Sequence, residues 1–235
     1  MRQITIFLLT FLTIGCSNKI QNFEGFKSLP SVQELKFNDD FSNLNFENIK
    51  FAYSANNTEL PVRFDFTNKI ENNIQSESVI DYSIDSTLNL EKEGYNLNIS
   101  KNKISVEAND EAGLFYAFIT LNQLIEDSKA NNVNLPMVSI KDYPSLKFRP
   151  IHIDIKHHME KKSYYFDLID HLAKQKINGI IVEFEDKLKY ELRPKIGSSD
   201  ALSIKWWIEL SEYANKRNIE INPLVQGLGH ASFIL

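Results

Sequence analysis

Alternating apolar and polar residues predict a β-hairpin in the middle of the chain. Apolar side chains occupy every second position in 95–99 and again in 104–108, and a polar Lys-Asn pair separates the two runs. This spacing is typical of two strands that bury one face of a sheet. Residues 112–126 then carry apolar side chains at the spacing of a helix face, and Asn109 and Asp110 are placed to cap that helix. The pattern predicts a sheet covered by a helix.

Weaker alternation on both sides of the hairpin extends this domain. The apolar run 137–140 predicts one more strand, and Pro144 after it marks a domain boundary. The polar-rich region upstream contains the weaker strand candidates 37–51, 62–66 and 79–84. We therefore predict an α+β domain over residues 31–143, built from an antiparallel sheet and at least one covering helix.

After Pro144 the hydrophobic period changes to a repeated strand–helix pattern. Strands are expected at 148–155, 179–184 and 220–225, and helices at 163–175 and 204–217. Consecutive buried strands joined by helices imply a parallel sheet. A closed (β/α)8 barrel needs eight such units and about 250 residues. Residues 144–235 are therefore predicted to be the incomplete N-terminal part of a TIM barrel.

Charged side chains gather where the predicted strands end. Lys156, His157 and His158 follow the first strand, Glu183 to Asp186 close the second, and His230 follows the third. The carboxyl ends of barrel strands form the active site in this architecture. Adjacent strand residues point to opposite faces, so His157 and His158 are not expected to share one metal ion. We expect neither a metal ion nor another cofactor.

The N-terminus predicts export from the cytoplasm. Arg2 precedes an apolar run, 4–14, that is too short to span a bilayer, and Cys16 directly follows Gly15. Cys16 is the single cysteine of the chain, which excludes an internal disulfide. The arrangement resembles a bacterial lipobox: a signal peptide over 1–15, a lipid anchor on Cys16, and a polar tether over 16–30.

The lipobox implies membrane attachment through the lipid, in the bacterial cell envelope. A plain signal peptide and secretion are the alternative. The net charge of −5, without a long basic block, argues against a nucleic acid partner.

Three segments in order carry a resemblance to a known family. They are EGYNLNISKNKISVEANDEAGLFYAFITLNQLI, FRPIHIDIKHHM and PLVQGLGHASFIL. Together they resemble the glycoside hydrolases of family 20, the β-N-acetylhexosaminidases, in which a small α+β domain precedes a (β/α)8 barrel. The resemblance covers about residues 93–235. It implies that Arg149 grips sugar hydroxyls, and that Asp154 and His158 match the aspartate and histidine of the family's first barrel strand.

Departures from the family pattern lie in the same region. Pro150 stands where glycine is usual, His157 where arginine is usual, and Glu183 where histidine is usual, whereas Asp186 keeps the family's aspartate. His230 matches a Gly-His pair near the family's pocket. The resemblance thus implies these substrate-binding residues: Arg149, Asp154, His158, Glu183, Asp186 and His230.

The resemblance also implies a mechanism. In this family the 2-acetamido oxygen of the sugar attacks the anomeric carbon, an aspartate orients it, and a glutamate acts as general acid and then as base. That Asp-Glu pair lies on the fourth strand, and the sequence has no Asp-Glu pair after Asp186. No catalytic residue is therefore expected in this chain; the general acid is expected beyond Leu235.

We thus expect a fragment of an exo-acting glycosidase that removes terminal N-acetylhexosamine from glycans, itself inactive. Another barrel glycosidase with the same accessory domain, such as an α-glucuronidase, is one alternative. A non-catalytic, glycan-binding lipoprotein is the other.

Overall fold

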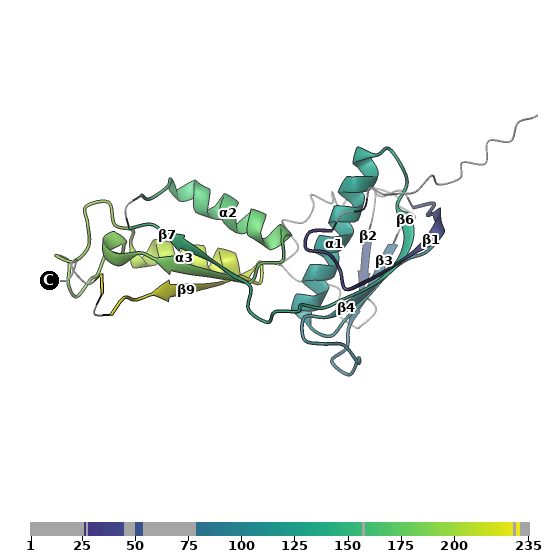
Figure 1. Cartoon of the computed structure of the whole chain (residues 1–235), viewed down its shortest axis with the longest axis horizontal. Coiled ribbons are helices and arrows are strands. Elements are labelled where there is room, and N and C mark those ends of the chain that lie inside the picture. Colours follow the sequence, from purple (N-terminus) through teal and green to yellow (C-terminus); the bar gives the residue numbers. More distant parts are fainter. Residues whose placement is uncertain are drawn as a thin grey trace, which may run out of the picture.

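A computed structural model describes residues 26, 28–44, 50–53, 79–156, 158–227 and 229–230. The predicted signal peptide, Cys16 and the strand candidate 62–66 lie outside these residues. Two lobes lie side by side (Figure 1): β1–β6 with α1 form the first lobe, and β7–β9 with α2 and α3 form the second. Among the described residues, no helix combines the length and apolar character that a membrane span requires.

The sheet of the first lobe is mixed, and this corrects the predicted antiparallel sheet. Its strands follow the order β1 (Glu34–Phe41), β6 (Pro136–Asp142), β4 (Tyr95–Ile99), β5 (Ile104–Ala108), β3 (Val79–Ile84) and β2 (Lys50–Tyr53). The pairs from β1 to β5 are antiparallel, whereas β3 runs parallel to both β5 and β2. β3 pairs with β5 rather than with β4, the next strand in sequence, and this crossover makes the pair parallel.

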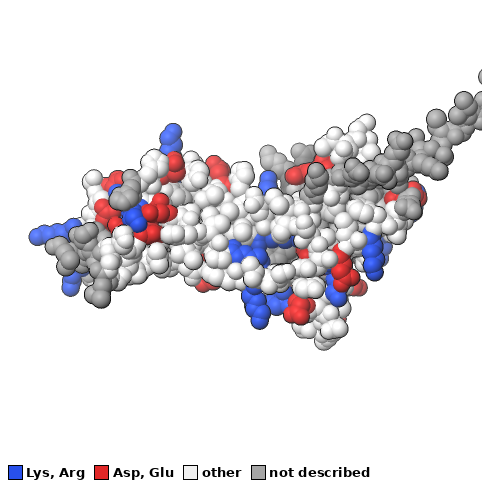
Figure 2. Space-filling model, in the orientation of Figure 1, with Lys and Arg blue, Asp and Glu red and all other residues white. Residues whose placement is uncertain are grey.

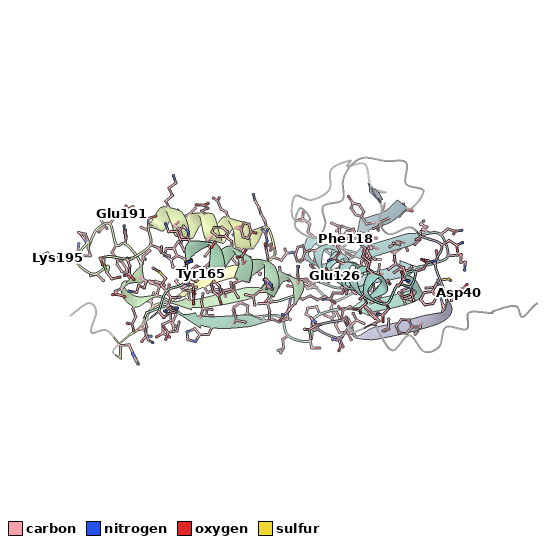
Figure 3. All side chains as sticks on the ribbon, turned by 90° about the horizontal axis from the view of Figure 1, so that it is seen from above. Asp40, Phe118, Glu126, Tyr165, Glu191 and Lys195 are labelled. Atoms are coloured by element: carbon pink, nitrogen blue, oxygen red, sulfur yellow. The ribbon has the colours of Figure 1, made fainter. Side chains whose placement is uncertain are left out.

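Helix α1 (Glu111–Ala130) covers the sheet, as predicted, and buries its apolar side chains against β3, β4 and β5. The predicted hairpin is confirmed, because β4 and β5 pair and bury alternate residues. Phe118 of α1 packs edge-on against Tyr82 of β3, with ring centroids 5.9 Å apart (Figure 3). The helix and the sheet therefore pack together, in agreement with the predicted α+β domain.

Asp110 caps α1 and also holds the chain before β4. Its Oδ1 accepts the Gly113 N–H at 2.8 Å, and its Oδ2 accepts the Glu93 N–H at 2.9 Å. We expect Asp110→Ala to lower the free energy of unfolding by about 1–2 kcal/mol, because both donors lose their acceptor. Asp110→Asn keeps one acceptor oxygen and is expected to lose about half as much. Urea unfolding of both variants measures this; equal losses would contradict the double role of the carboxylate.

The second lobe is a three-stranded parallel sheet with two helices. Its elements are β7 (Pro150–Asp154), α2 (Lys162–Lys174), β8 (Gly179–Glu183), a short 3-10 helix (Glu185–Lys187), α3 (Ile204–Asn215) and β9 (Glu220–Leu224). The order β7-β8-β9 with parallel pairing confirms the predicted strand–helix repeat. Tyr165 of α2, which is labelled in Figure 3, packs edge-on against Trp206 of α3. The ring centroids are 5.6 Å apart, and both residues are buried.

A buried polar network joins the two lobes. Lys176, in the turn after α2, donates to Asp142 Oδ2 at 2.7 Å and to the Tyr95 hydroxyl at 2.9 Å. Tyr95 also contacts the Thr120 hydroxyl at 2.6 Å. Burial raises the pKa of Tyr95 well above its usual range, and burial lowers the pKa of Lys176 against the attraction of Asp142. This network fixes the amino end of β8 to the first lobe.

Candidate active site

The carboxyl ends of the parallel strands form a charged edge on the second lobe. Asp154 and Glu183 are the last residues of β7 and β8, and they are register partners. The strand arrows point away from the first lobe, so this edge lies at the far end of the molecule (Figure 1). Acidic and basic side chains gather side by side at that end (Figure 2). The structure therefore brings together Asp154 and Glu183, two of the predicted site residues.

Glu183 lies at the centre of this edge and is only 6% exposed. Its Oε1 accepts hydrogen bonds from Lys156 Nζ and Gln226 Nε2, and its Oε2 lies 3.1 Å from His152 Nε2. These partners come from β7, from the turn after β7 and from the segment after β9. One buried carboxylate thus connects all three strands.

Lys156 lies between the two carboxylates. Its Nζ is 3.1 Å from Asp154 Oδ2, and its backbone N–H donates to Asp154 Oδ1 at 3.0 Å, which turns the chain back over the strand end. The hydrogen bond to Glu183, and then the one to Asp154, raises the pKa of Lys156. The ammonium is therefore charged at neutral pH and sits in a fixed position.

Asp186 lies in the short 3-10 helix that follows β8. Its backbone oxygen accepts the Ser198 N–H at 2.8 Å, and its carboxylate lies 3.7 Å from Lys187 Nζ. The hydrogen bond of Lys187 to Asp200, at 2.9 Å, raises the pKa of Lys187. These contacts hold the loop against the end of β8 and leave the Asp186 carboxylate about one-third exposed.

The two predicted histidines are not brought into the Glu183 cluster. His158 is 79% exposed on its side chain and contacts Glu160 at 2.9 Å. His230 is exposed and has a positive φ of 56°. His157 lies outside the described residues. Sugar contact by His158 and by His230 therefore stays a prediction.

Arg149 occupies the opposite end of β7 from the Glu183 cluster. Its guanidinium donates to Glu93 Oε2 at 2.8 Å, to the Tyr116 hydroxyl at 3.1 Å, and to the backbone oxygens of Leu146 and Lys176, both at 2.8 Å. All these partners lie at the junction of the lobes. Arg149 precedes the strand, whereas Asp154 ends it, so β7 separates the two by roughly 17 Å. Arg149 thus lies at the junction of the lobes, and its contact with sugar hydroxyls stays a prediction.

Three residues of the cluster were not predicted from the sequence: His152, Lys156 and Gln226. His152 shares a strand face with Asp154 through the period of two, so alternation could have identified it. Lys156 belongs to the polar run that follows the first predicted strand. Gln226 shows no local pattern, since its contact with Glu183 spans 43 residues.

The chemistry of the cluster suits a ligand rich in hydroxyl groups. Carboxylates accept hydrogen bonds from hydroxyls, and an ammonium donates to them. Within the ranges that the structure describes, no group of three or more His, Cys, Asp or Glu side chains could hold a metal ion.

Comparison with known proteins gives one family. The sequence model described as "Glycosyl hydrolase family 20, domain 2" matches residues 25–143. β-Hexosaminidase B of Pseudoalteromonas piscicida is 25% identical over 170 residues, which cover 58% of this chain and 22% of that protein. A β-hexosaminidase of Porphyromonas gingivalis is 30% identical over 179 residues, covering 66% of this chain and 23% of that protein. The chain thus spans less than a quarter of the length of these relatives.

Solved structures show the same fold. The crystal structure of a β-N-acetylhexosaminidase from Bacteroides fragilis superposes with a TM-score of 0.70 at 22% identity. The superposition covers 88% of this chain and 46% of that one. It therefore extends across both lobes.

Proposed function

Because this chain belongs to glycoside hydrolase family 20, we propose that it is part of an exo-acting β-N-acetylhexosaminidase that removes terminal N-acetylhexosamine from glycans. The observation that carries the proposal is the cluster of Asp154, Lys156 and Glu183 at the carboxyl ends of parallel strands. Among the matching structures, a Streptomyces plicatus β-hexosaminidase is in complex with the product GlcNAc. A cluster of carboxylates and one ammonium is suited to such a neutral sugar.

We further propose that the second lobe is the first part of a (β/α)8 barrel. Helix α2 follows β7 and helix α3 follows β8, and both cover the same face of the sheet. Beside α3 lies an apolar groove of about 460 Å³, lined by Val182, Phe184, Trp207, Ile208, Ile221 and Pro223. A further strand–helix unit would cover this groove in the same way.

The reaction that we propose is substrate-assisted hydrolysis with retention. The 2-acetamido group of the sugar supplies the nucleophile, and a glutamate on a later strand supplies the proton to the leaving group. The residues of this chain bind and orient the sugar. Carboxylate and ammonium groups at the strand ends would hold its hydroxyls while the bond is broken elsewhere in the pocket.

Activity of the full-length gene product tests this proposal. We expect release of 4-nitrophenol from the 4-nitrophenyl N-acetyl-β-glucosaminide, the galacto-configured substrate, or both. The matching β-glucuronide and α-glucuronide serve as controls. Release from an α-glucuronide alone would favour the alternative glycosidase, and glycan binding without release would favour a binding lipoprotein.

We also propose that Cys16 carries a lipid that anchors the protein in the bacterial cell envelope. The single cysteine directly after a short apolar run supports this. Cys16→Ser is expected to move the protein from the membrane fraction to the soluble fraction and to abolish labelling with a palmitate analogue. Unchanged fractionation of the variant would sink the proposal, whereas soluble wild-type protein would indicate secretion.

A further inference from the structure

Glu183 is too enclosed and too fully engaged to be a simple sugar ligand. Its side chain is 8% exposed, and its two oxygens already face Lys156, Gln226 and His152. A carboxylate has about four acceptor sites, so these three partners and the low exposure leave little room for a substrate hydroxyl. The contacts of Glu183 instead determine where the neighbouring polar groups lie.

Lys156 is the group that Glu183 holds most directly. An ammonium has three N–H donors, and among the described residues Glu183 and Asp154 accept from it. One donor remains for a ligand. The side chain is 12% exposed, so its ammonium is enclosed but retains access to solvent.

The surroundings favour a neutral ligand over an anionic one. Lys156 carries one positive charge, and Asp154 and Glu183 carry one negative charge each, so the three groups together have a charge of about −1. His152 is the other titratable group against Glu183. An anionic sugar would meet a repulsive field, whereas a sugar hydroxyl can accept from the ammonium.

We propose that Glu183 is a positioning residue and that Lys156, held by it between β7 and β8, donates a hydrogen bond to one hydroxyl of the substrate sugar. The proposal rests on the proposed glycosidase function. Gln226 is held by the same carboxylate oxygen, so Glu183 also fixes the segment after β9 relative to β7. A sugar bound at these strand ends would meet a donor that is already oriented, which lowers the entropy cost of binding.

Kinetics of the full-length gene product with the 4-nitrophenyl N-acetylhexosaminide test the proposal. Lys156→Met is expected to raise KM about 10- to 100-fold, the effect typical of losing a hydrogen bond to a charged group, with a smaller change in kcat. Lys156→Gln, a neutral donor, should give an intermediate KM. Glu183→Gln should raise KM as well, and the double variant Lys156→Met/Glu183→Gln should be no worse than Lys156→Met. Lys189→Met removes an exposed lysine from the next loop and should change nothing.

Deoxy substrates distinguish a bound hydroxyl from a merely structural role. For the one monodeoxy sugar that lacks the recognised hydroxyl, wild type and Lys156→Met should have equal kcat/KM. The inference would be overturned if wild type and Lys156→Met differed in kcat/KM for every deoxy sugar. It would also be overturned if the effects of Lys156→Met and Glu183→Gln were additive. Either result would leave the glycosidase function intact. A wild-type product without activity would overturn the proposed function and this inference together. Thermal unfolding of each variant checks that it folds, and Lys156→Gln stands in if Lys156→Met does not.

Discussion

Replacing Lys176 with methionine is expected to destabilise the protein by about 3–5 kcal/mol. The ammonium is the partner of Asp142 in the buried network between the lobes, and the Lys176 and Asp142 side chains are 6% and 9% exposed. Methionine fills a similar volume but leaves the buried Asp142 carboxylate without its counter-charge, and of the described residues only the Tyr95 hydroxyl and the Gln33 N–H still donate to it. The predicted loss of stability comes from the unpaired, buried charge of Asp142 rather than from the strength of the ion pair.

Matched variants separate these two contributions. Lys174→Met, an exposed lysine at the end of α2, should change the free energy of unfolding by less than about 0.5 kcal/mol. The double variant Asp142→Leu/Lys176→Met removes both charges and should recover most of the loss. Urea unfolding monitored by circular dichroism measures all three. A Lys176→Met protein as stable as wild type would show that the network does not hold the lobes together.

Replacing Arg149 with methionine is expected to lower the free energy of unfolding by about 3 kcal/mol. The substitution removes four hydrogen bonds and leaves the Glu93 carboxylate without its ion-pair partner. The Arg149 and Glu93 side chains are 15% and 13% exposed, so solvent screens their attraction only in part. Arg149→Lys keeps the charge but loses the planar fork that reaches several acceptors at once, and should restore less than half of the stability.

The same variants decide between the two roles that were considered for Arg149. A junction residue predicts a loss of stability with KM for the sugar unchanged at a temperature where the variant is folded. A sugar-binding residue predicts the reverse, a raised KM with unchanged stability. Lys147→Met, which removes an exposed neighbouring charge, is the control for both measurements.

Local patterns predicted most of the elements. The period of two in β4 and β5, the cap at Asp110 and the strand–helix repeat after Pro144 each depend on neighbouring residues. The mixed sheet could not be predicted, because β3 pairs with β5 across a crossover that no turn signal specifies. Strand order depends on contacts between distant segments, which periodicity does not encode.

The candidate site was predictable only where strand topology alone determines which residues lie together. Asp154 and Glu183 end consecutive parallel strands, so topology alone places them together. Arg149 precedes its strand, and its partner Glu93 lies 56 residues away in the other lobe, so its assignment needed the structure. Lys156 was noted only as part of a polar run, because its role depends on which side chains face it.

The two ends of β8 have separate roles, so substitutions at one end should not affect the other. The amino end is fixed to the first lobe through Lys176, and the carboxyl end carries Glu183. A strand of five residues separates them by roughly 13 Å, beyond the distance at which substitutions usually interact. Free-energy changes at the two ends should therefore add. Substitutions that strengthen the junction can therefore offset destabilising substitutions at the carboxyl end, and the two sets can be selected independently.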